Sequence, residues 1–155
     1  ASGDQEAEHP RPFKVGMELR SSVIGPPGSF GCDPMSLPYQ MVGDGHATHM
    51  GKIDVIDGFV CNSLETGAFT NGSGIYVAAN GDRLAVSFAG MAYLNPDGSY
   101  TGDGVASALG GTGRFSSATG EWAWTLAGML YPDGTAIAAL EGEGWIAYDA
   151  SDGSY

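Results

Sequence analysis

Two histidines, His46 and His49, stand three residues apart in a segment flanked by Gly45 and Gly51. Residues three apart on a strand face opposite sides, so the pair could share a metal only if the glycines bend the backbone. A zinc site needs three or four ligands, and no obvious third histidine accompanies them. We therefore expect no metal site, and no motif indicates a cofactor. His49 has two further interpretations: a ring that hydrogen-bonds a backbone carbonyl, or an acid–base group in a cavity.

Two carboxylates are the other candidates for catalysis. Glu18 lies between Lys14 and Arg20 on the polar side of an alternating segment, and Glu121 directly precedes Trp122. A desolvated carboxylate has a raised pKa and can accept a proton. The alternative is an ion-paired or solvated outer surface. His49, Glu18 and Glu121 are thus the candidate catalytic residues, with no reaction assigned to them.

Large aromatic residues recur at strand spacing. Trp122 and Trp124 share a face with Leu126 and Leu130. Such a stripe can fill a core, form a subunit interface or stack against a flat ligand. The candidate ligand-binding residues are Trp122, Trp124, Tyr39 and Phe88.

Strands must position these side chains. Apolar residues alternate with polar ones from Phe13 to Leu19, the period of a half-buried strand. Further apolar runs cover 39–42, 53–60, 75–79, 84–88, 122–130 and 136–148. Glycine supplies 26 of the 155 residues, about twice its usual share. These patterns predict an all-β fold of about eight strands, without a segment of helical period.

Turn signals separate the strands. Asn80-Gly81 between two alternating runs is the strongest short-range signal for a hairpin. Asn95-Pro96-Asp97-Gly98 and Tyr131-Pro132-Asp133-Gly134 fit type I turns. Consecutive hairpins favour one eight-stranded antiparallel barrel, because closure removes exposed edges. The alternative is a two-sheet β-sandwich.

Three motifs in chain order carry a family resemblance: Gly45-His46-Ala47-Thr48-His49-Met50-Gly51, Ala79-Asn80-Gly81-Asp82, and Gly110-Gly111-Thr112-Gly113-Arg114-Phe115 followed by Ala118-Thr119-Gly120. The last of these resembles the glycine-rich signature of dirigent and allene-oxide-cyclase-like barrels. The three together resemble small exported bacterial proteins of that broad type.

This resemblance implies an eight-stranded calycin-like barrel with an apolar lumen, often associated into dimers or trimers. In the plant relatives the lumen holds a reactive oxylipin or phenoxy-radical species and steers its cyclisation or coupling. The shared motifs are mainly turns and glycines, which transmit architecture. The acidic residues that plant dirigent proteins use have no match in this chain.

The composition of the chain argues against a nucleic-acid partner and against a membrane span. The net charge of −12 comes from 18 acidic residues against 6 Lys and Arg. Nucleic-acid affinity depends largely on Lys and Arg contacts with phosphates, so we expect no nucleic-acid partner. No run of 18 apolar residues occurs, so we expect no membrane span. Residues 1–12 predict a disordered acidic tail ahead of a barrel domain at 13–155.

The two cysteines, Cys32 and Cys61, lie in a Gly/Pro-rich loop and at a strand end. A disulfide between them would close a loop of about 30 residues and contribute about 3–4 kcal/mol to stability. Disulfides persist in oxidising compartments, so this pairing predicts a secreted, extracellular or periplasmic protein. The alternative is two unpaired thiols in a cytosolic protein.

Three functions follow from these features. The first is a secreted barrel, a dimer or trimer as the family resemblance implies, that binds a small apolar or aromatic molecule, with or without turnover. The second is an extracellular structural or assembly protein without a ligand pocket. The third is a cyclase or isomerase of the allene-oxide-cyclase-like type, which rests on analogy of fold.

Overall fold

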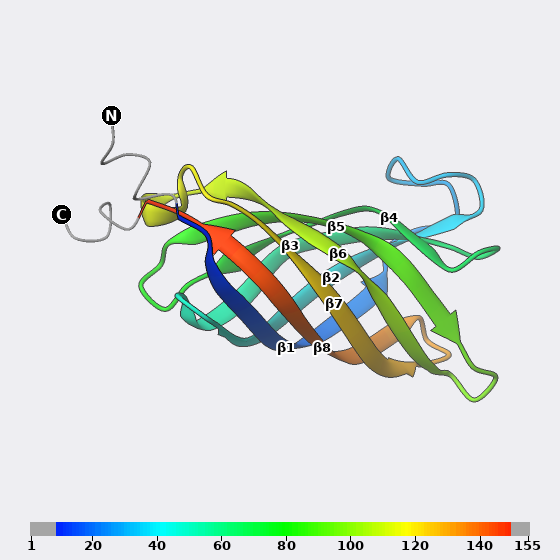
Figure 1. Ribbon diagram of the computed structural model, residues 1–155. Coiled ribbons are helices and arrows are strands. Elements are labelled where there is room, and N and C mark those ends of the chain that lie inside the picture. Colours follow the sequence, from blue (N-terminus) through cyan, green and yellow to red (C-terminus); the bar gives the residue numbers. More distant parts are fainter. Residues whose placement is uncertain (1–8, 150–155) are drawn as a thin grey trace.

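The computed structural model describes residues 9–149. Eight antiparallel strands pair in sequence order, and β8 pairs with β1 to close the barrel (Figure 1). The first four strands are β1 (Arg11–Val23), β2 (Ser36–Ala47), β3 (Gly51–Ser63) and β4 (Ala68–Val77). The others are β5 (Arg83–Leu94), β6 (Ser99–Gly111), β7 (Thr119–Leu130) and β8 (Thr135–Ala147), with one short 3-10 helix, η1 (Gly113–Phe115).

The predicted barrel is confirmed, and the two-sheet sandwich is wrong. A sandwich leaves its edge strands unpaired across the two sheets, whereas β1 has a paired neighbour on both sides. Closure also shifts one predicted boundary. Arg11 and Pro12 pair with Ile146 and Trp145 of β8, so β1 begins within the segment 1–12 that was predicted to be a tail. Residues 1–8 of that segment lie outside the described residues.

One end of the barrel is plugged by side chains. Helix η1 lies at the end where β1 begins and β8 ends (Figure 1), and its Phe115 is fully buried there. Other fully buried residues of this plug are Phe13, Ile53, Leu84 and Ile146. The glycine-rich segment around Phe115 therefore supplies the closure of one end of the barrel.

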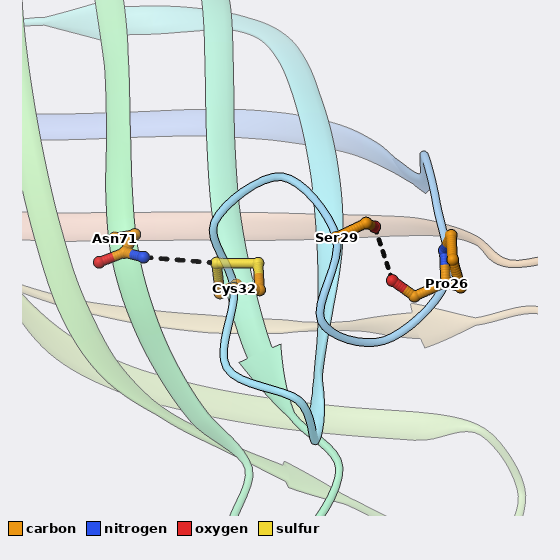
Figure 2. Close-up of a disulfide and its surroundings, with 5 residues drawn as sticks. Pro26, Ser29, Cys32 and Asn71 are labelled. Carbon is orange, nitrogen blue, oxygen red and sulfur yellow. Dashed lines mark hydrogen bonds between the residues drawn. A yellow bond between two sulfur atoms is a disulfide. The ribbon is translucent and has the colours of Figure 1, made fainter.

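The 24–35 loop lies at the opposite end, and the predicted disulfide ties it to β3. Cys32 and Cys61 are bonded, with their Cα atoms 5.6 Å apart, and the described residues include no free cysteine. Val60 and Asn62 line the lumen, so Cys61 between them points outward. Figure 2 shows the bonded loop and the nearby Asn71, whose Nδ2 donates to Cys61 Sγ at 3.7 Å. The disulfide thus holds the loop against the outer face of the barrel.

Within this loop Phe30 is exposed, whereas Cys32 is buried. Besides the disulfide, the loop is held by backbone hydrogen bonds, such as Gly28 N–H to Ser36 O, and by the Ser29 hydroxyl, which donates to Pro26 O (Figure 2).

Candidate functional site

The lumen opens away from the plugged end into an outer chamber. This chamber encloses about 640 Å³ not filled by atoms, part of it open to solvent. Side chains that line only this chamber include Ser21, Tyr39, Asn62, Leu94, Tyr100 and Ala138. Most of this wall is hydrocarbon, and the polar groups among it are hydroxyls and one amide.

An inner chamber lies between the outer chamber and the plug. The space in it that atoms do not fill is about 590 Å³, part of it open to solvent, and it is lined by, among others, Val55, Tyr76, Val86, Phe88, Trp122 and Trp124. Five residues line both chambers: Leu19, Met41, Val60, Phe69 and Leu126. The two chambers are therefore parts of one apolar cavity along the barrel axis.

Trp122 and Trp124 form the aromatic wall of the inner chamber. Alternation along β7 turns both inward, and they are 2% and 3% exposed. The Trp124 ring centroid lies 6.1 Å from that of Phe69 and 6.2 Å from that of Phe88, the latter edge-on. Trp122 packs toward the plug, with its centroid 4.6 Å from that of Phe13. Trp124 thus faces the open side of the cavity, and Trp122 stands at its floor.

Two glycines on neighbouring strands make room for these indoles. A Cβ atom at Gly104 of β6 would lie 2.5 Å from Trp124 Cζ2 and 2.1 Å from the Ala89 carbonyl oxygen. A Cβ atom at Gly142 of β8 would lie 2.8 Å from Trp122 Cδ1. Both distances are below van der Waals contact, so neither position can carry a side chain while the indoles keep their places.

The indole N–H of Trp124 is buried without a hydrogen-bond partner among residues 9–149, whereas the Trp122 indole interacts with the buried hydroxyl of Tyr76. Buried donors are normally paired, because a buried polar group without a partner costs free energy. Arg114 Nε of η1 is also buried without a hydrogen bond, but it is ion-paired with an Asp82 carboxylate oxygen 3.5 Å away.

Phenols supply the ionisable groups of the cavity. Burial raises the pKa of Tyr39, Tyr76 and Tyr100 above that of an ordinary tyrosine, and the nearby Tyr39 contributes to the rise at Tyr100. These groups are therefore neutral phenols at neutral pH. The described residues that line the two chambers include no Asp, Glu or His.

The three candidate catalytic residues lie apart from the cavity and from each other. Glu18 is exposed on the outer face, where Arg20 Nη1 lies 3.1 Å from its Oε1 and 3.3 Å from Asp44 Oδ1. Glu121 is exposed on the outer face of β7. His49 lies in the turn between β2 and β3, and its Nε2 is 3.0 Å from the Pro12 carbonyl oxygen. This contact corresponds to the structural interpretation of His49.

All four candidate ligand-binding residues line the cavity: Tyr39 the outer chamber, and Phe88, Trp122 and Trp124 the inner one. Phe69, Tyr76 and Tyr100 also line the cavity and were not predicted from the sequence. Tyr76 alternates with Ile75 and Val77 in an apolar run that gives no sign of which face is inside. Tyr100 follows a turn and begins β6, a strand in which small residues and glycines weaken the alternation.

The fold and cavity define this chain as a closed eight-stranded antiparallel barrel with an apolar lumen. Among solved structures it is similar to the pterocarpan synthase dirigent protein GePTS1, with a TM-score of 0.53 and 13% sequence identity. The match covers 92% of this chain and 88% of that one. No protein-family model matches the sequence, and neither does any curated protein sequence.

The dirigent-like barrel predicted from the three motifs is therefore confirmed as a fold. At this identity the likeness concerns architecture and not activity. Between residues 9 and 149, no helix is long and apolar enough to cross a membrane.

Proposed function

We propose that this protein binds a small apolar or aromatic molecule in its lumen. The observation that carries the proposal is the continuous apolar cavity, open at one end and lined by Trp124, Phe69 and Phe88. Ligand pockets typically combine apolar walls with a few polar groups that orient the ligand. The hydroxyls of Tyr39 and Tyr100 provide such polar groups near the open end.

Binding is better supported than turnover. General acid–base catalysis at neutral pH needs a group that titrates near that pH, and burial moves the phenols of the cavity away from it. The cyclase or isomerase alternative has support from the structural neighbour, whose name describes a pterocarpan synthase. However, the described residues that line the lumen include no Asp, Glu or His that could act as the acid or base of such a reaction.

Titration with the neutral fluorescent probe N-phenyl-1-naphthylamine tests lumen binding. We expect saturable binding to the full chain, weakened about tenfold or more by Ala138→Phe, which fills the outer chamber. The matched control is Ala139→Phe on the adjacent, outward-facing position of β8. Thermal melts establish that both variants fold. Equal affinities of the two variants, or no binding to the wild-type chain, would contradict the proposal.

Self-association is a second candidate property, supported by one row of side chains on the outer face. Met129, Ile137, Arg20 and Val42 are register neighbours across β7, β8, β1 and β2. The three apolar members of this row are exposed. Exposed apolar side chains on neighbouring strands favour association.

Light scattering after size-exclusion chromatography tests association. A dimer or trimer would have two or three times the 15.9 kDa of one chain. Ile137→Glu should then shift the mass toward the monomer, whereas Val105→Glu, outside the row on β6, should not. A monomer at high concentration would contradict both the oligomer and the assembly alternative.

We also propose that the protein functions outside the cytosol. The disulfide that ties the 24–35 loop to β3 supports this location, because cytosolic thiols are kept reduced. Intact mass measured before and after reduction of natively purified protein provides the test. If the bridge formed in the cell, reduction raises the mass of the chain by about 2 Da. Alkylation of free thiols before lysis prevents a bridge from forming later.

A further inference from the structure

We propose that the open end of the barrel is a docking surface for a basic, apolar-rich segment of another protein. The connections that form this end are 24–35, 64–67, 95–98 and 131–134. Each of them carries or adjoins exposed large apolar side chains, namely Phe30, Met35, Leu64, Tyr93, Leu94 and Tyr131. These four connections with their apolar side chains are called the mouth rim. The turns at the plugged end expose no large apolar side chain.

Backbone hydrogen bonds join the mouth rim into a continuous frame. The Leu64 N–H donates to the Met35 carbonyl, which links the first two connections. Corresponding bonds link each of the others to the next strand end around the barrel: Ala92 N–H to Gly67 O, Leu130 N–H to Gly98 O, and Val23 N–H to Gly134 O. Leu94 also lines the outer chamber, so the rim surrounds the opening of the cavity. Exposed apolar side chains grouped in this way mark an interaction surface.

Charge identifies the chemistry of the partner. Each connection of the mouth rim carries one exposed carboxylate: Asp33, Glu65, Asp97 and Asp133. None of the four contains Lys, Arg or His. Arg20, on the outer face of β1, is already held by Glu18 and Asp44. Because interfaces pair complementary charges around an apolar centre, the rim matches a segment that alternates apolar side chains with Lys or Arg.

The same charges argue against other occupants of the mouth rim. An anionic lipid surface would be repelled by the four carboxylates. A second copy of this chain would repeat those carboxylates at its own mouth, and its plugged-end turns expose no large apolar side chain. A basic, apolar-rich polypeptide satisfies both features of the rim. Once docked, it would cover the cavity opening and control exchange of the contents of the lumen.

A labelled peptide tests the role of charge. The probe is a fluorescein-labelled peptide with two copies of the repeat Leu-Lys-Lys-Leu-Leu-Lys-Leu, and fluorescence anisotropy measures its affinity for the full chain. We expect saturable binding, weakened about tenfold or more when the rim is neutralised by Asp33→Asn, Glu65→Gln, Asp97→Asn and Asp133→Asn together. No binding to the wild-type chain would contradict the proposal.

A second variant of equal net charge is the matched control. It neutralises four exposed carboxylates outside the rim, through Asp54→Asn, Glu121→Gln, Glu141→Gln and Glu143→Gln. We expect this variant to keep the peptide affinity of the wild-type chain to within about threefold. Thermal melts establish that both variants fold. Equal losses in the two would show attraction to the net charge of the protein and would overturn the assignment to the rim.

The apolar part of the rim has its own test. Leu64→Ser combined with Leu94→Ser should weaken the peptide about tenfold, because both side chains would be buried on docking. Val105→Ser combined with Leu109→Ser changes two exposed residues of β6 outside the rim and should have little effect. A peptide with Ser in place of every Leu should bind much more weakly. Equal affinity of the two peptides would contradict apolar docking.

Two further measurements separate this inference from its alternatives. It does not depend on the proposed lumen binding, so Ala138→Phe, which fills the outer chamber, should leave the peptide affinity unchanged. A large loss in that variant would place the peptide inside the lumen and overturn docking at the rim. Sedimentation with phosphatidylcholine vesicles tests a lipid surface. Vesicle binding that Leu64→Ser and Leu94→Ser abolish, without any peptide binding, would replace the protein partner by a membrane.

Discussion

Gly104 shows how a single missing side chain fixes the position of an aromatic one. A Cβ atom there would collide with the Ala89 carbonyl and with the Trp124 indole, whereas Gly16 on the outer face of β1 has nothing within 4 Å of an added Cβ. The two glycines look alike in the sequence. Because their surroundings differ, we expect alanine substitution to change the free energy of unfolding in opposite directions at the two positions.

We expect Gly104→Ala to lower the free energy of unfolding by about 1–3 kcal/mol through overpacking. Gly16→Ala should be neutral or stabilise by about 0.4–1 kcal/mol, because alanine restricts the unfolded chain. Urea titration of both variants provides the measurement. Equal stability of the two would contradict the close packing around Trp124.

Ionisation of the buried Tyr76 phenol makes the stability of the protein depend on pH. Burial raises the pKa of the Tyr76 phenol above its ordinary value of about 10, so the unfolded chain loses this proton at lower pH than the folded one. The contribution of the neutral phenol is fully present below about pH 10 and is lost as the pH rises further.

We therefore expect the free energy of unfolding to decline less between about pH 9 and pH 11 in Tyr76→Phe than in the wild-type protein. Tyr93→Phe changes an exposed tyrosine of β5 and serves as the control. Denaturant titrations at several pH values measure the decline. Parallel declines in all three proteins would show that Tyr76 is not the source.

Residue types alone located the aromatic side chains of the lumen but not its chemistry. Trp122 and Trp124 could be predicted because period-two alternation decides which side of a strand is buried. Glu18 and Glu121 could not be placed so simply, since the polar side of a strand faces the lumen in some barrels and solvent in others. The surroundings of the two indole N–H groups depend on neighbours distant in sequence, such as Tyr76 beside Trp122, and no local pattern indicates them.

At the scale of elements, the 24–35 loop and its disulfide form an outer clamp. Cys61 points away from the lumen, and the loop covers Cys61 and Pro38 on the outer face, so both are fully buried. The clamp therefore contributes to stability without contact with the cavity.

Removal of the clamp should separate stability from binding. We expect the Cys32→Ala/Cys61→Ala double variant to lose about 3–4 kcal/mol of unfolding free energy in urea. Its affinity for N-phenyl-1-naphthylamine should stay within about twofold of wild type, because the loop does not line the lumen. A large loss of affinity in a folded double variant would instead identify the loop as part of the binding site.

The hairpins were the most predictable elements, because their turn chemistry is local. Asn80-Gly81 and the two Asn/Tyr-Pro-Asp-Gly turns all join neighbouring strands. The first half of β4 was missed, and the reason is a bulge. Asn71 has a φ of 54° where the register of β4 with β5 shifts, which interrupts the alternation that marks a strand.

At the scale of the whole molecule, charge acts against the compact barrel. A net charge of −12 on a small domain produces self-repulsion, since the cations are too few to pair with 18 carboxylates. The short ion pairs around Arg20 neutralise only a small part of this surface.

We expect the melting temperature to rise when sodium chloride is increased from about 20 to about 200 mM, because the screening length shortens to below the spacing of many surface charges. Differential scanning calorimetry across the salt series measures the shift. A reduced-charge control, such as Glu121→Gln combined with Glu141→Gln, should show a smaller rise. A melting temperature that falls with salt would contradict net repulsion.

The closed order of strands has one further consequence. Arg11 and Ile146 are register neighbours, so β1 begins and β8 ends side by side at the plugged end of the barrel (Figure 1). The cavity opens at the other end. A short peptide joining Ala147 to Arg11 could therefore produce a circular permutant, with new ends cut into the Asn95–Gly98 turn. A support attached next to Arg11 or Ala147 would likewise hold the barrel with its opening directed into solution.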